Sequence, residues 1–420
     1  MTSNDGAIPS PARALAPDLA RGMMLLLIAI ANVSIYLWGH ETLPGTVHPV
    51  DGSALDGVLS TIAILFVDAR VYPMFAFLFG YGMVQFAASR AARGVPERGV
   101  RRMLRRRHLW LIVFGLVHAA LLFAGDILGA YGLAGLILVA LLFRRTDRTL
   151  GIVAGILTGL LALSALLALV SGVVVGSMPV RMREMYGGGG FDVGGADLLS
   201  GTADYGWSIL NRLGFWALGT VGVVIGLVVP ACILLGWLAA RHRWLEIGGR
   251  PRLGPVAVVG IAIGVLGAVP QALIHLELLP FFADVWWAFS GVTQLTGMAG
   301  GIGYAALFAL VAVRVRDRVP TILSAVAAVG KRSLTSYLLQ SVVFAPLLTA
   351  WGLGLGARIG TATAFAIAAG VWLLSVLLAV LLERRGMRGP AEALLRRLTY
   401  GRGDAASASP ASPPLPGSPS

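Results

Sequence analysis

Long apolar runs separated by short polar segments dominate the chain. A helix that crosses a bilayer needs about 20 mostly apolar residues, and ten runs approach or exceed that length. Their boundaries are approximately 22–38, 70–89, 108–124, 127–143, 149–176, 215–240, 253–279, 287–313, 333–350 and 360–383. This pattern predicts an all-α integral membrane protein, a bundle of about 10 transmembrane helices.

Two stretches fit this pattern less well. The run at 53–68 is shorter and ends at Asp68, so we expect a helix that lies in the interface or re-enters the membrane beside the second span. The stretch 207–240 is too long for one simple span. We therefore expect 207–214 to form a separate amphipathic turn before a span at 215–240.

The composition indicates the same class of protein. Hydrophobic residues make up 57% of the chain and charged residues 13%, against about 25% charged in ordinary soluble domains. These proportions exclude a cytosolic enzyme, a disordered protein and a disulfide-rich secreted domain. We expect a cytoplasmic N-terminal segment at 1–20, one polytopic membrane domain at 21–402, and a disordered Ala/Ser/Pro-rich tail at 403–420.

The net charge of +13 comes almost entirely from arginine, since Lys331 is the only lysine. With the N-terminus in the cytoplasm and the spans alternating, 28 basic residues fall on the cytoplasmic side. Three fall outside, namely Arg181, Arg183 and Arg358. This positive-inside asymmetry predicts an even number of spans with both termini in the cytoplasm.

One basic cluster admits more than one interpretation. Arg101, Arg102, Arg105, Arg106 and Arg107 recur at helical spacing just before the third span. They are expected to anchor the helix in anionic lipid headgroups, or to bind an acidic cytoplasmic ligand such as the phosphates of coenzyme A. Nucleic acid is not expected as a partner, because the aromatic residues that would stack on bases are missing.

Few polar side chains lie inside the predicted spans, and each is a candidate functional group because its burial in lipid is costly. Asn32 and His118 each lie about ten residues into a span, and Gln340 about seven. A neutral imidazole can act as a general base near pH 7. The structural alternative for His118 is a hydrogen bond to a neighbouring helix.

Asp126 follows His118 by eight residues, about 12 Å along a straight helix, so the two side chains meet only if the helix breaks near Gly125. The alternative role for Asp126 is an N-cap for the fourth span. Asp68 and Arg70 are expected to pair at the membrane interface. His40 and His48 lack an evident third ligand, so no metal site is expected.

Several motifs resemble a known family. Asp18-Leu-Ala-Arg21-Gly22, with Asn32 ten residues later, resembles the opening of the YeiB-like bacterial membrane proteins, classed under domain of unknown function 418. The other matching motifs, in chain order, are Phe66-Val-Asp68-Ala-Arg70-Val-Tyr72-Pro73, the arginine cluster leading to His118, Gly125-Asp126-Ile127-Leu128 with Tyr131, Gly330-Lys331-Arg332 with Tyr337 and Gln340, and Leu398-Thr399-Tyr400-Gly401.

The wider resemblance is to transmembrane acyltransferases. It implies a location in the bacterial cytoplasmic membrane, acyl-CoA as co-substrate, and a glycan or lipid acceptor on the far side. His118 would be the base or a transient acyl carrier, Asn32 would orient it or bind the oxyanion, and Asp126 would be the third catalytic candidate. Candidates to bind the phosphates are Arg21, Arg102, Arg105 and Arg106. Further candidates for substrate or structural contacts are Asp68, Arg70, Tyr72, Tyr337 and Gln340.

Two other functions stay open at this stage. A small-molecule transporter or exporter would show a continuous polar path and broken helices, which Pro73, Pro230, Pro270 and Pro346 could supply. A non-catalytic structural or regulatory protein would have each polar residue satisfied by a neighbour. The sequence leaves the oligomeric state and the acceptor open.

Overall fold

The computed structural model describes residues 11–179, 181–182, 195–245, 250–315 and 317–400. The tail at 403–420, expected to be disordered, lies outside these residues. Within them the fold is helical, with no named strand and one isolated bridge between Thr42 and Pro49. The helices are α1 (Pro11–Val33), α2 (Ala54–Phe66), α3 (Val71–Ala91), α4 (Glu97–Leu121), α5 (Leu128–Leu142), α6 (Asp147–Gly176), α8 (Gly195–Ser200), α9 (Tyr205–Ile225), α10 (Val228–Arg241), α11 (Arg250–His275), α12 (Trp287–Arg314), α13 (Thr321–Lys331), α14 (Ser333–Leu348), α15 (Thr361–Arg384) and α16 (Pro390–Tyr400). Short 3-10 turns are η1 (Ser34–Tyr36), η3 (Pro280–Val285) and η4 (Leu355–Ala357).

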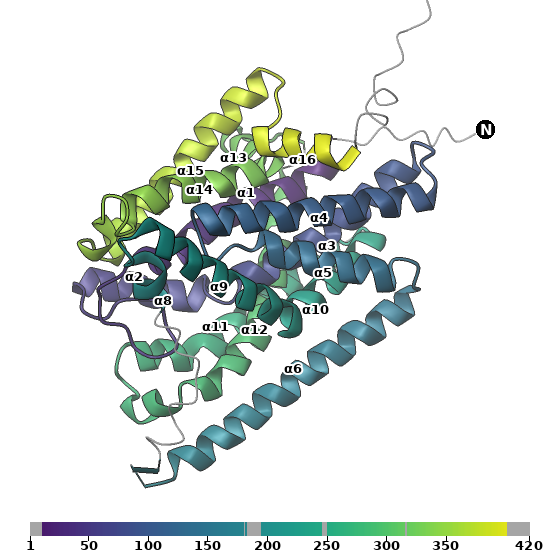
Figure 1. The fold of residues 1–420 in the computed structure, drawn as a ribbon. Coiled ribbons are helices and arrows are strands. Elements are labelled where there is room, and N and C mark those ends of the chain that lie inside the picture. Colours follow the sequence, from purple (N-terminus) through teal and green to yellow (C-terminus); the bar gives the residue numbers. More distant parts are fainter. Residues whose placement is uncertain (1–10, 180, 183–194, 246–249, 316, 401–420) are drawn as a thin grey trace, which may run out of the picture.

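Helix α1 runs through the middle of the bundle, where it packs against α3, α12, α13 and α15 (Figure 1). The helix α6 lies along one side and packs on α10 and α12 (Figure 1). On another side α9 covers both α4 and α5. The α4–α5 pair therefore packs against α9, and this pair carries the candidate site described below.

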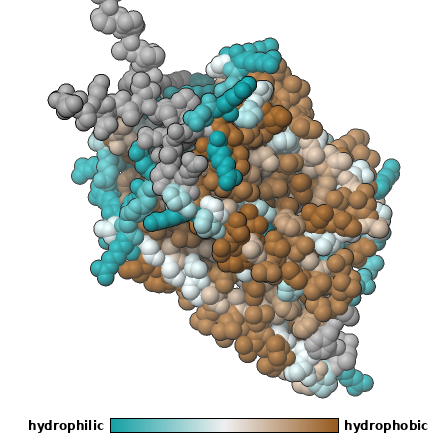
Figure 2. All heavy atoms as spheres, turned by 180° about the vertical axis from the view of Figure 1, so that it is seen from behind, coloured by the Kyte–Doolittle hydropathy of each residue, from teal (hydrophilic) through white to brown (hydrophobic). Residues whose placement is uncertain are grey.

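The surface of the bundle is apolar. Seven helical stretches of the described residues are long and apolar enough to cross a membrane: Leu15–Tyr36, Ala54–Ala91, Asp147–Gly176, Tyr205–Ile225, Pro251–His275, Trp287–Arg314 and Thr361–Arg384. Figure 2 shows one face of the molecule covered by a broad apolar area, with hydrophilic side chains gathered toward its edges. Such a surface is stable only against lipid, so the chain is a helical multi-pass membrane protein.

The single span predicted at 215–240 is wrong. The structure has two helices there, because α9 ends at Ile225 and α10 begins at Val228. Between them Leu227 has a positive φ (+67°, with ψ −34°), a backbone conformation that is rare for a residue with a side chain and that interrupts the helix. The predicted turn at 207–214 is likewise absent, since those residues belong to α9. Two of the predicted spans correspond to short helices, since α5 has 15 residues and α14 has 16.

The short run at 53–68 is confirmed as a separate helix. The Ser53 side chain and the Asp56 carboxylate form a reciprocal capping box at the start of α2. At the other end Ala69 has φ +56°, and this left-handed residue separates α2 from α3. The break places Asp68 and Arg70 in a turn inside the bundle.

Helices α3 and α10 approach each other through reciprocal glycines. A Cβ atom on Gly80 would meet the carbonyl of Ile233, and one on Gly236 would meet the carbonyl of Phe77. Glycine at both positions allows the two backbones to touch, which is the usual basis of close helix packing in membranes.

We expect Gly236→Val to lower the stability of the fold by about 1–3 kcal/mol, because the new side chain must displace the α3 backbone. The matched control is Gly159→Val on α6, where a Cβ meets nothing within 4 Å. Both substitutions change helix propensity equally. Thermal unfolding of the two variants in lipid nanodiscs measures the difference, and equal melting temperatures would contradict the packing described here.

Candidate active site

His118 and Asp126 form a buried pair. Helix α4 ends at Leu121, so the chain turns back before α5 begins at Leu128. This break brings the Nδ1 atom of His118 within 2.8 Å of the Asp126 Oδ1 atom. Both side chains are at most 1% exposed. The helix break that contact between His118 and Asp126 requires is therefore present, and it lies at Leu122 rather than at Gly125.

The second oxygen of Asp126 is also used. It accepts hydrogen bonds from the Gly129 backbone N–H (2.8 Å) and from Nε1 of Trp216 (3.3 Å). The carboxylate therefore satisfies the first turn of α5, as the N-cap alternative predicts, while it also binds His118. The tautomer that fits this contact carries its proton on Nδ1, which donates to the carboxylate, and its lone pair on Nε2.

Glycines allow this close approach of α4 and α5. A Cβ atom on Gly115, one turn before His118, would meet the Asp126 carboxylate and the Gly129 backbone. A Cβ atom on Gly129 would meet the indole of Trp216. Side chains at either position would push the imidazole, the carboxylate and the indole apart.

Helix α9 holds the α4–α5 turn from outside. The Arg212 guanidinium is 1% exposed and donates to the carbonyls of Ala119 (3.1 Å) and Ala120 (2.8 Å) at the end of α4. Its charge is favourable there because the carbonyl end of a helix is partially negative. Trp216 lies one turn further along α9. The sequence suggested no role for Arg212, because an arginine at the edge of a predicted span is common.

Aromatic rings surround the imidazole of His118. The ring of Tyr337 on α14 lies 5.2 Å from it, and that of Phe123 lies 6.1 Å away. Tyr36 stacks on Phe123 at 5.4 Å. The Nε2 atom of His118 is buried and has no hydrogen-bond partner among the described residues. The pair thus presents one unsatisfied basic nitrogen to an aromatic environment.

The other polar residues predicted inside the spans have different surroundings. Asn32 is partly buried on α1, and the hydrogen bonds of the described residues include none between Asn32 and His118. The aromatic side chain that reaches the His118 environment from this end of α1 is Tyr36. Gln340 donates through Nε2 to the carbonyl of Leu25 (2.9 Å) and so joins α14 to α1.

Asp68 and Arg70 do not pair through their side chains, so the predicted ion pair is wrong. The Asp68 carboxylate binds Nε2 of His48 at 2.7 Å. The Arg70 guanidinium donates to the backbone carbonyls of Ile64 (3.0 Å), Asp68 and Gly264 instead. The turn at Ala69 directs the two side chains toward different neighbours.

The same region contains a polar chain that the sequence did not reveal. His48 is fully buried, and its Nδ1 atom lies 3.3 Å from Oγ of Ser34. The series Ser34–His48–Asp68 joins a loop to two helix ends. At Tyr72, another candidate for substrate contacts, the backbone carbonyl accepts a hydrogen bond from the Tyr131 hydroxyl (2.7 Å).

A cavity of about 300 Å³ lies at the end of the bundle where α14 begins. We call this end the basic end. The charged residues that line the cavity are Asp18, Arg21, Arg107, Lys331 and Glu392. Burial, and then the neighbouring charge of Arg21, lower the pKa of the Arg107 guanidinium.

The predicted phosphate-binding arginines divide into two groups. Arg21 lines the cavity. Arg102 and Arg105 are exposed, and Arg106 donates to the carbonyl of Leu398 on α16 (3.0 Å). Arg107 lines the cavity instead of these three arginines. The sequence pointed to it only as one member of the basic cluster before the third span.

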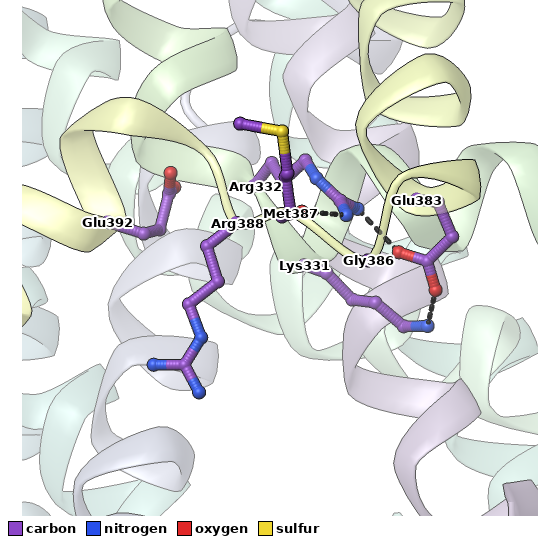
Figure 3. Close-up of a pocket in the computed structure, with 7 residues that line it drawn as sticks. All are labelled: Lys331, Arg332, Glu383, Gly386, Met387, Arg388 and Glu392. Atoms are coloured by element: carbon purple, nitrogen blue, oxygen red, sulfur yellow. Dashed lines mark hydrogen bonds and ion pairs between the residues drawn. The ribbon is translucent and has the colours of Figure 1, made fainter.

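A second cavity, of about 490 Å³, adjoins the first and shares Lys331 and Glu392 with it. Lys331 and Arg332 converge on the Glu383 carboxylate at 2.7 Å each, while Arg388 points away from these pairs (Figure 3). Glu392 of α16 accepts from the backbone N–H groups of Leu334 (2.7 Å) and Thr335 (3.1 Å) and so caps the start of α14.

The fold and this geometry define a helical multi-pass membrane protein with a buried carboxylate–imidazole pair and a basic cavity at one end. Residues 239–402 match the model of the family described as Protein of unknown function (DUF418). The chain is 28% identical to the uncharacterized protein YeiB of Escherichia coli (strain K12), over 91% of this chain and 95% of that relative. The chain is therefore similar to YeiB over most of its length, and its C-terminal part matches the DUF418 model.

Further relatives come from bacilli. The uncharacterized protein YxaH of Bacillus subtilis (strain 168) is 27% identical over 91% of this chain and 93% of its own length. An uncharacterized 39.9 kDa protein from Bacillus acidopullulyticus is 36% identical over 29% of this chain and 32% of its own. No solved structure matches the chain. The wider resemblance to acyltransferases stays a prediction.

We expect Asp126→Leu to release the imidazole of His118, because Nδ1 then loses its acceptor and the proton distributes over both nitrogens. Nitrogen-15 NMR of histidine-labelled protein measures this, with His118→Asn used to assign the signal. The control is Asp51→Leu, which removes the exposed partner of His40. A single Nδ1–H tautomer in Asp126→Leu would show that the carboxylate does not orient the ring.

Proposed function

We propose that the protein is a membrane-embedded acyltransferase that moves an acyl group from acyl-CoA to a hydroxyl or amine acceptor on a glycan or lipid. The observation that carries this proposal is the buried His118–Asp126 pair with an unsatisfied Nε2 atom. A histidine oriented by a carboxylate is the arrangement by which enzymes activate an acceptor for acyl transfer.

The chemistry needs no further cofactor in this proposal. Nε2 of His118 takes the proton from the acceptor, whose oxygen or nitrogen attacks the carbonyl carbon of the thioester. The carbon–sulfur bond then breaks, and the thiolate of coenzyme A leaves and takes the proton back from the imidazolium. Asp126 stabilises the positive charge on His118 between these steps.

The basic cavity supports the donor side of the proposal. Arg21 and Arg107 supply guanidinium groups of the kind that bind phosphate. Eleven residues of α4 separate Arg107 from His118, a rise of about 16 Å. The extended pantetheine arm of coenzyme A can reach over such a length from its phosphates to its thioester. Phe75 and Phe79 line the cavity, and their rings contact that of Tyr131, which lies on α5 five residues after Asp126.

The proposal includes an orientation. The basic end would face the bacterial cytoplasm, where acyl-CoA is made, and both termini would lie there, with about ten membrane crossings in the bacterial cytoplasmic membrane. The 28 to 3 distribution of basic residues supports this orientation. The acceptor would then approach from the opposite side.

A transporter is the second candidate, and the interruptions at Ala69 and Leu227 favour it. Broken helices often form the binding sites of transporters. At Ala69, however, the neighbouring groups are occupied by protein, because Arg70 binds the carbonyls of Ile64, Asp68 and Gly264. The experiments below separate the two candidates, since a transporter does not consume acetyl-CoA.

For the chemical step, we expect His118→Ala to reduce coenzyme A release from acetyl-CoA by at least about 100-fold, with acetyl-CoA binding retained. Inverted membrane vesicles from expressing bacteria contain the native acceptors, and a thiol reagent measures the release. The control is His242→Ala, whose side chain is 67% exposed. Wild-type release no faster than in vesicles without the protein would reject the acyltransferase function.

For the donor site, we expect Arg107→Ala to weaken acetyl-CoA binding about tenfold or more, because a charged hydrogen bond contributes about 1.5–3 kcal/mol. Isothermal titration in nanodiscs measures the dissociation constant. Arg105→Ala is the matched control, since it removes an exposed arginine one half-turn away on the same helix. Equal affinities of the two variants would place the phosphates elsewhere.

A further inference from the structure

Near the His118–Asp126 pair lie buried polar atoms that the chemical step proposed above does not use, namely the Tyr36 hydroxyl and Oε1 of Gln340. Like Nε2 of His118, these atoms have no regular hydrogen-bond partner among the described residues. The residues of the three atoms are 2–3% exposed. A polar atom buried in this way is costly, and so its persistence calls for an explanation.

Helix α14 links these three residues, which we call the cluster together with their neighbours on its buried face. On α14, Tyr337, Gln340, Ser341 and Phe344 follow the i, i+3, i+4, i+7 spacing and form one buried face. Tyr337 of this face is in ring contact with His118. The Tyr36 ring lies 5.9 Å from that of Phe344, and its hydroxyl lies beside Ser341.

We propose that Tyr36 and Gln340 form the binding subsite for the acceptor, and that the acceptor is a neutral hydroxyl group rather than an amine. This inference rests on the acyltransferase function proposed above. The hydroxyl would donate toward Oε1 of Gln340 or Nε2 of His118 and accept from Tyr36. Its proton moves to Nε2, and its oxygen forms the ester bond as the thioester bond breaks.

The charges of the cluster decide between hydroxyl and amine. An amine acceptor is mostly an ammonium ion near pH 7 and needs a carboxylate partner in a buried site. The carboxylate of the cluster is Asp126, and its oxygens already bind His118, Gly129 and Trp216. Tyr36, Ser341 and Gln340 are neutral. The cluster therefore suits a neutral hydroxyl.

In the proposed subsite, Tyr36 has the place that the sequence suggested for Asn32. Asn32 was the residue of α1 expected beside His118, but it is Tyr36 that joins the cluster through Phe123 and Phe344. A tyrosine near the end of a span normally reads as an interfacial anchor. Only its complete burial and its unsatisfied hydroxyl distinguish it.

The test uses purified full-length protein in nanodiscs with acetyl-CoA and two probe acceptors, octyl β-D-glucoside and octylamine. We expect acetylation of the glucoside at a rate at least tenfold above that of the amine. Tyr36→Phe should raise the KM for the glucoside about tenfold with little change in kcat, and Gln340→Met should act in the same direction. The dissociation constant of acetyl-CoA should not change.

Two controls separate binding from folding. Tyr36→Phe keeps the ring that packs on Phe123 and Phe344, so its melting temperature should stay close to that of the wild type. Tyr304→Phe removes a hydroxyl that binds the carbonyl of Phe66, away from the cluster, and should leave the KM unchanged.

The outcomes distinguish this inference from the proposed function. A preference for octylamine, an unchanged KM in Tyr36→Phe, or acetyl-CoA binding without acetylation of the glucoside would overturn the acceptor subsite and leave the donor site standing. Failure to bind acetyl-CoA at all would overturn the proposed function, and the subsite with it.

Discussion

A charge buried in an apolar bundle needs a partner, and this constraint shapes the interior of the protein. Three buried charged side chains illustrate it. Arg70 is held by backbone carbonyls freed at a helix break, Arg212 by the carbonyl end of α4, and Asp126 by an imidazole, an indole and a backbone amide. The breaks at Leu122 and Ala69 therefore do not weaken the fold, because they provide the backbone groups that these side chains need.

The candidate site also contains a buried charge that needs partners, the Asp126 carboxylate in the turn between α4 and α5. Three elements contribute to it: α4 supplies His118, the turn supplies Asp126, and α9 supplies Arg212 and Trp216. Glycine at positions 115 and 129 allows the elements to approach closely. Within the part of the chain that the structure describes, Nε2 of His118 is buried without a hydrogen-bond partner, as are the Tyr36 hydroxyl and Oε1 of Gln340.

The sequence predicted the class of fold and part of the site. Apolar runs and the low charge identified a helical membrane protein, since hydropathy records the lipid environment directly. His118 and Asp126 were identified because ionisable groups are rare inside spans. Their contact depended on a backbone break, which hydropathy does not record, and the break at Leu227 went unpredicted for the same reason. Asp68 and Arg70 were expected to pair because they are neighbours in sequence, but the turn at Ala69 separates their side chains.

Tyr36 and Arg212 were beyond sequence reasoning for another reason. A tyrosine or an arginine at the edge of a span is ordinary, and only the packing of α9 and α14 buries these two completely. Burial of this kind is a property of the assembled bundle. No local pattern around either residue records it.

The capping of α14 has a consequence for the order in which the chain is made. Glu392 accepts from the amides that begin α14, yet it lies 57 residues after Thr335 in the chain. On the ribosome these amides emerge long before the carboxylate that satisfies them. Helix α14, which carries Tyr337 and Gln340, reaches its final set of hydrogen bonds only when α16 has been synthesised. Completion of the candidate site is thereby tied to completion of the polypeptide.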